Sequence, residues 1–105
     1  MIDQRLIDEV VQRIVERFHP RKVVVFGSHA RGDADAGSDL DLFVEMETPL
    51  RPPERAIEIS RLFGLHPWPM DIVVYTPSEA ERLRRVTGSF VNAIESEGEV
   101  VYERP

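Results

Sequence analysis

The sequence predicts an α+β domain in which helices pack against a mixed sheet of about four strands. An amphipathic helical repeat opens the chain, and three short apolar runs rich in β-branched residues follow it. Gly- and Pro-containing turns separate these runs from further helical segments. The expected order is α-β-β-α-β-α-α-β, and 105 residues suffice for one domain spanning 1–105.

The first helix is predicted from an apolar stripe that recurs every fourth residue. This stripe consists of Ile2, Leu6, Val10, Ile14 and Phe18. His19–Pro20 ends the helix, because the residue before a proline is pushed out of the helical region. The β-branched run at 22–26 is short enough for a buried strand.

A tight turn is expected at Gly27–Ser28, followed by one helical turn over 29–31 with Ser28 near its start. Residues 32–37 are small and polar and are predicted to form a loop. The second strand is predicted over 38–45, with alternating apolar residues on one face.

The middle of the chain is expected to form a helix over 53–65, with a proline in its first turn. Its end leads into the segment His66–Pro67–Trp68–Pro69, which can be neither helix nor central strand. A third strand is predicted over 70–75.

A capping box is predicted where Thr76 precedes Pro77 and Glu79, because Thr caps the helix and Glu reaches back to it. The remaining elements are a helix to about Val86, an interruption at Thr87–Gly88, a helix over 89–97 ended by Gly98, and a strand over 100–102.

The net charge of −6 disfavours direct binding to nucleic acid, which normally requires a basic face. An anionic nucleotide would need metal ions to offset the repulsion. No apolar stretch approaches the roughly 20 residues of a membrane span, so no membrane association is expected. The absence of Cys excludes disulfides and thiolate metal sites and fits a cytoplasmic location.

Three aspartates stand where strands normally avoid them. Asp39 and Asp41 are two residues apart at the start of a predicted strand, so their side chains share one face. Asp71 opens the next strand. A cation facing all three would explain this pattern, because Mg²⁺ prefers hard oxygen ligands and keeps positions for water and phosphate. The structural alternative is that they are solvated residues at strand ends.

The compound pattern Gly27–Ser28, Arg31–Gly32 and Ser38–Asp39–Leu40–Asp41, with a later strand aspartate, resembles the nucleotidyltransferase superfamily. Its members include DNA polymerase β and kanamycin nucleotidyltransferase. The short chain most resembles the minimal nucleotidyltransferase (MNT) group, including the MntA-like antitoxins of HEPN/MNT toxin–antitoxin systems. The resemblance covers nearly the whole chain and implies the nucleotidyltransferase fold.

The resemblance implies a role for each matching residue. Gly27 and Ser28 would hold the β- and γ-phosphates of a nucleoside triphosphate, with ATP the expected donor. The catalytic, metal-binding carboxylates would be Asp39, Asp41 and Asp71, which would bind two Mg²⁺ ions, with Mn²⁺ as an alternative. Asp71 would also accept the proton of the attacking hydroxyl. Further nucleotide contacts would come from Arg31, and Ser38 would steady Asp39.

The implied activity is metal-dependent transfer of AMP onto a hydroxyl. MNT proteins of this kind commonly pair with a HEPN toxin and add AMP to one of its tyrosines, so a HEPN partner and an antitoxin role are expected. A non-catalytic antitoxin that blocks its partner by docking is the alternative. An EF-hand calcium loop at 33–44 is excluded, because Ser38 stands where Gly is needed and Val44 where Glu is needed. A Walker phosphate loop is excluded because Gly-Lys-Ser/Thr is absent.

Several other polar and aromatic residues have structural interpretations that compete with functional ones. His29 is expected at the surface rather than on a phosphate. Trp68 could stack on a base, meet a partner or pack over the sheet edge. A solvated helix face is the default for Arg82, Arg84 and Arg85, as a solvated loop is for Asp33 and Asp35.

Overall fold

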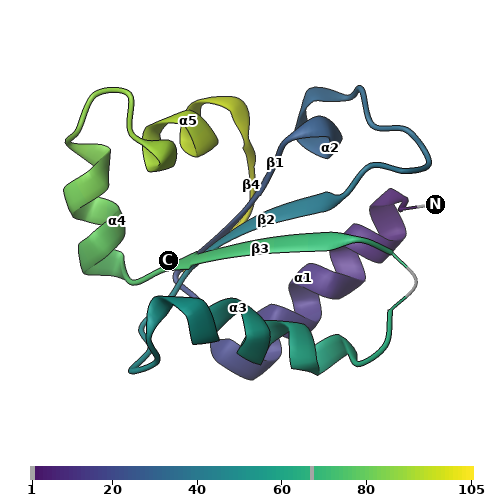
Figure 1. Cartoon of the computed structure of the whole chain (residues 1–105), viewed down its shortest axis with the longest axis horizontal. Helices are drawn as coiled ribbons and strands as arrows, with labels where there is room; N and C mark the ends of the chain where they lie inside the picture. Colours follow the sequence, from purple (N-terminus) through teal and green to yellow (C-terminus); the bar gives the residue numbers. More distant parts are fainter. Residues whose placement is uncertain (1, 67) are drawn as a thin grey trace.

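The computed structural model describes residues 2–66 and 68–105 and confirms an α+β fold with a four-stranded mixed sheet (Figure 1). The strand order is β3-β2-β1-β4. In this sheet β1 is antiparallel to both β2 and β4, whereas β2 and β3 are parallel. The strands are β1 (Lys22–Phe26), β2 (Leu40–Glu45), β3 (Met70–Tyr75) and β4 (Glu99–Glu103).

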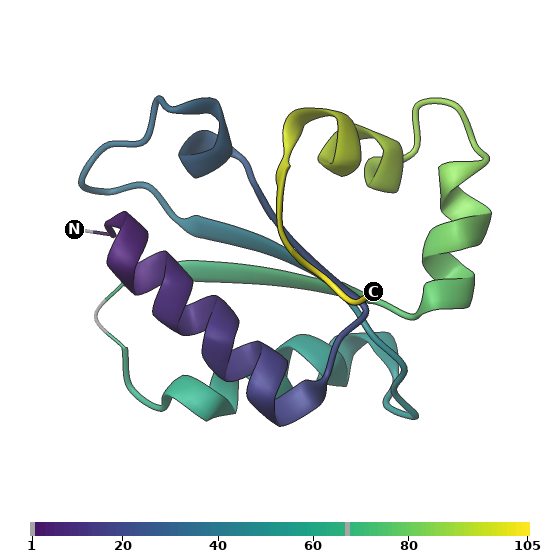
Figure 2. The ribbon, with the colours of Figure 1, turned by 180° about the vertical axis from the view of Figure 1, so that it is seen from behind.

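The helices cover the two faces of the sheet separately, as Figures 1 and 2 show. One face packs against α1 (Gln4–Phe18) and α3 (Pro52–Ser60), which continues as the 3₁₀ turn η1 (Arg61–Phe63). The other face packs against α4 (Pro77–Arg84) and α5 (Phe90–Glu97). The short helix α2 (Ser28–Arg31) follows β1 directly.

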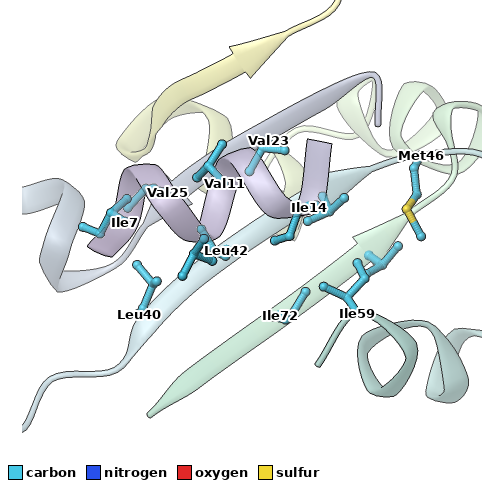
Figure 3. Packing of buried hydrophobic residues seen from close by; sticks show 13 residues of the cluster. Ile7, Val11, Ile14, Val23, Val25, Leu40, Leu42, Met46, Ile59 and Ile72 are labelled. Carbon is cyan, nitrogen blue, oxygen red and sulfur yellow. The ribbon is translucent and has the colours of Figure 1, made fainter. Parts of the chain in front are cut away.

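The larger core lies between the sheet and α1 and α3 (Figure 3). It takes Ile7, Val11 and Ile14 from α1, while Leu40 and Leu42 come from β2. The opposite face buries Phe43, whose side chain alternates with those leucines along the strand. The alternation predicted for the second strand is therefore confirmed, and it directs Asp41 toward the α4–α5 side.

Helix boundaries follow local capping chemistry. Asp3 caps α1 by accepting a hydrogen bond from the Leu6 N–H, so the helix begins at Gln4 rather than at Ile2. The predicted capping box of Thr76 and Glu79 is present at the start of α4. The largest differences from the predicted ends are that β2 begins at Leu40, α3 gives way to η1 after Ser60, and α4 ends at Arg84. The starts of α3 and α5 and both ends of β4 differ from the predictions by one residue.

The predicted loop at 66–69 is irregular where it is described, and Pro67 lies outside the described residues. Trp68 packs against the larger core, with its ring 6.4 Å from that of Phe63. Of the interpretations open for Trp68, packing is the one that this contact supports. No helix within residues 2–66 and 68–105 combines the length and the apolar character that crossing a bilayer demands.

Candidate nucleotide and metal site

The candidate site is built at the end of β1 and the beginnings of β2 and β3. In the sheet register Asp41 lies opposite Phe26 on β1 and opposite Asp71 on β3. Cross-strand partners project to the same face of a sheet, so the two aspartates are neighbours on one face. Gly27 follows Phe26 directly and brings the turn to the same place.

Gly27 lies directly against the Asp41 carboxylate. A Cβ added at Gly27 would overlap Asp41 Oδ2 and stand 3.2 Å from its Cγ. The backbone of Gly27 also has a φ of 74°, a conformation that favours glycine. The turn and the carboxylate therefore touch only because residue 27 has no side chain.

The pKa of the Asp41 carboxyl is shifted by several charged groups that lie near it. Burial raises the pKa of the Asp41 carboxyl, and the negative charges of Asp71 and Asp39 raise it further. The positive charges of His29 and Arg31 lower the pKa of Asp41 and so partly offset this rise. Asp39 and Asp71 are thus both close enough to repel the Asp41 carboxylate, which is costly unless a cation balances the charges.

Asp39 precedes the first residue of β2 and is exposed, as is Asp71. Within residues 2–66 and 68–105, no three acidic or histidine side chains form a ready-made cage for a metal ion. Mg²⁺ is commonly held by one or two carboxylates together with substrate phosphates rather than by a cage of protein ligands. The donor set fits such an ion: Asp39, Asp41 and Asp71 are the carboxylates that could hold it together with phosphate oxygens.

The remaining predicted site residues surround the turn. Ser28 is the first residue of α2, and the half-exposed Arg31 at its other end pairs with Asp33 at 3.2 Å. The Ser38 hydroxyl donates to Asp35 at 3.2 Å and accepts from the Asp35 N–H at 2.9 Å. Ser38 thus holds the loop, and its expected role beside Asp39 stays a prediction.

Asp35 organises this loop, although the sequence indicated only a solvated position for it. Besides Ser38, it accepts a hydrogen bond from the Gly37 N–H at 2.9 Å. An Asx turn of this kind depends only on neighbouring residues, so the spacing Asp-x-Gly-Ser in the sequence could have predicted it. His29 is partly buried rather than fully at the surface, and its Nε2 has no hydrogen-bond partner among the described residues.

The sequence patterns did not predict a buried network of charged side chains, which lies at the end of the sheet away from the candidate site. Glu45 is fully buried at the end of β2 and pairs with Arg84 and, at 2.9 Å, with Arg21. Arg84 also binds Glu95 at 2.8 Å, which corrects the expectation of a solvated helix face at this residue. Arg82 and Arg85 are exposed, as expected.

Comparison with known proteins agrees with this geometry. The family model described as "nucleotidyltransferase domain" matches residues 7–101. This chain therefore belongs to the nucleotidyltransferase domain family, whose class of activity is the transfer of a nucleotidyl group.

A crystal structure from Sulfolobus solfataricus, of a protein described only as a candidate nucleotidyltransferase, is similar in fold with a TM-score of 0.65. The similarity covers 95% of this chain and 79% of that one at 23% sequence identity, so it shows the shared fold alone. No curated protein matches the chain in sequence.

Proposed function

We propose that this protein transfers AMP from ATP to a hydroxyl group, with a tyrosine of a HEPN-family toxin as the acceptor, and so acts as an antitoxin. The observation that carries the transferase part is the contact between Gly27 and the Asp41 carboxylate, with Asp71 in register beside it. A triphosphate on the turn would lie next to the carboxylates that hold its metal ion.

In the proposed reaction the acceptor oxygen attacks the α-phosphorus of the nucleotide. The bond from that phosphorus to the bridging oxygen of the β-phosphate breaks, and pyrophosphate leaves in line. When bound, Mg²⁺ would neutralise the negative charge of the phosphates. The Gly27–Ser28 turn would hold the β- and γ-phosphates, and Asp39 and Asp41 would hold the metal ions that bridge the triphosphate. Asp71 would complete the metal site and accept the proton of the attacking hydroxyl.

The partner role rests on the resemblance of the Gly27–Ser28, Arg31–Gly32 and Ser38–Asp41 motifs to the MNT group. A partner protein that presents its own hydroxyl would supply the acceptor of the transfer.

The test is to incubate the protein with ATP, Mg²⁺ and the HEPN-family protein proposed as its partner, and to measure the mass of both chains. AMP addition to a tyrosine of the partner is the expected result. The matched variant is the pair Asp39→Asn and Asp41→Asn, which keeps side-chain shape while removing both charges. Toxin neutralisation by the folded double variant without AMP transfer would instead support the docking alternative, and no mass change with any divalent metal would refute the transferase proposal.

A further inference from the structure

A half-exposed aromatic ring lies beside the candidate site. Phe90 is the first residue of α5, and 50% of its surface is accessible to solvent. Isolated apolar residues on a protein surface are normal and need no explanation. Phe90, however, lies next to β1, the strand that leads into the Gly27–Ser28 turn. Its place beside the candidate site therefore calls for an explanation.

Phe90 is held there by Phe26. The two ring centroids are 6.2 Å apart and the ring planes are perpendicular. In such an edge-to-face pair, Phe26 covers at most one face of the Phe90 ring. The contact therefore braces the ring on one side, while half of the surface of Phe90 stays accessible to another group.

Phe26 connects this ring to the carboxylates. It is the last residue of β1, it precedes Gly27, and it lies opposite Asp41 in the register. Cross-strand partners share a face of the sheet, so Phe26, Asp41 and Asp71 follow one another across the face that α5 covers. Both α2 and α5 contact β1, and Figures 1 and 2 show its end between them.

We propose that Phe90, braced by Phe26, is the stacking platform for the base of the nucleoside triphosphate. This inference rests on the proposed function, because it places the triphosphate on the Gly27–Asp41 side of Phe26. Every nucleobase has a π-face, so stacking on a phenylalanine binds purines and pyrimidines alike. Phe90 would therefore strengthen the binding of a nucleotide, which has a base, but not the binding of an inorganic polyphosphate, which has none.

The experiment compares the dissociation constants of Mg–ATP and Mg–tripolyphosphate, measured by calorimetry for the full chain. Tripolyphosphate carries the phosphates without a base. Phe90→Ala is expected to weaken ATP binding roughly 10-fold or more while leaving tripolyphosphate binding unchanged. Phe90→Leu keeps an apolar side chain without a π-face and should behave like the alanine variant, whereas Phe90→Trp should bind ATP at least as well as the parent.

Ile57→Ala is the matched control, because Ile57 is exposed to a similar extent, 55%, on α3 at the opposite side of the sheet. It should bind both ligands normally. Unchanged ATP affinity in Phe90→Ala and Phe90→Leu would overturn the platform and leave the proposed function intact. Equal weakening of both ligands would overturn it as well, because Phe90 would then act through the fold. Failure of the parent protein to bind either ligand with Mg²⁺ would refute the proposed function itself.

Discussion

The carboxylate of Asp41 occupies the space that a side chain at Gly27 would need, so the backbone of the turn lies directly on the acid group. Because β1 ends at Phe26, opposite Asp41, the next residue must pass over that carboxylate. A glycine at this point brings the turn into contact with the acid group, which is the arrangement that a metal-bound phosphate requires.

Substitution of Gly27 by alanine should therefore damage both stability and nucleotide binding. The new Cβ would overlap Asp41 Oδ2, and the φ of 74° would be strained for any residue with a side chain. We expect a loss of about 2–3 kcal/mol in the free energy of unfolding. Urea denaturation measures the first effect, and calorimetric titration with Mg–ATP the second.

Gly64→Ala is the control for backbone strain alone. Gly64 has a backbone close to that of Gly27, with φ 58° and ψ −136° against 74° and −152°, but a Cβ there would meet nothing within 4 Å. The substitution should cost about 1 kcal/mol. Equal losses in the two variants would show that the contact with Asp41 is unimportant.

The sequence predicted the fold well because most of its signals are local. The capping box at Thr76 and Glu79 and the alternation of apolar residues in β2 depend only on neighbouring positions. The proximity of Asp41 to Asp71 is a long-range relation, and it was inferred from the resemblance and from the cost of placing acids in strands. The register of β2 with β3 confirms that these two residues are partners.

The sequence did not reveal the burial of Glu45. A glutamate at the end of a predicted strand is typical of a solvated position, and its partner Arg84 lies 39 residues further along the chain. Local patterns cannot pair two charges across that distance. The same limit hid the partial burial of His29, whose surroundings come from other parts of the chain.

Truncation of Glu45 should be strongly destabilising. Glu45→Ala removes a carboxylate that is fully buried between Arg21 and Arg84, so both cations lose a partner. We expect a loss of about 3 kcal/mol in the free energy of unfolding. Glu81→Ala is the control, because Glu81 also pairs with Arg84 but is 53% exposed, and it should cost under about 1 kcal/mol. Guanidinium unfolding of both variants measures the two losses. Equal losses would show that the burial of Glu45 does not determine how much its ion pairs contribute.

The ion pair between Arg55 and Glu79 should control stability in acid. A hydrogen bond from Arg55 lowers the pKa of Glu79 from 4.5 to about 2. The unfolded chain then binds a proton at higher pH than the folded one, so this stabilisation is complete above pH 4.5 and is lost as the pH falls toward 2. Glu79→Gln should flatten the decline of stability over that range in thermal melts. A parallel decline in the variant would contradict the assignment.

Asp41 should have the opposite pH dependence. Its pKa is raised by burial and then by Asp71 and Asp39, so the folded protein without metal holds a proton that the unfolded chain has released. Stability must then fall as the pH rises from 3.8 through the raised value. Asp41→Asn should remove this fall in metal-free buffer. A pH profile identical to that of the parent would show that Asp41 is not perturbed.

Asp71→Asn should separate stability from function. The substitution removes a negative charge next to Asp41, so the metal-free protein should become more stable at neutral pH, by up to about 1 kcal/mol. It also removes an expected metal ligand, so the rise in melting temperature that Mg–ATP gives the parent should shrink or vanish. Melting curves with and without Mg–ATP measure both effects in one sample. A variant that is destabilised without metal and still stabilised by Mg–ATP would place Asp71 in the fold rather than in the site, because loss of a true metal ligand would weaken the stabilisation by Mg–ATP.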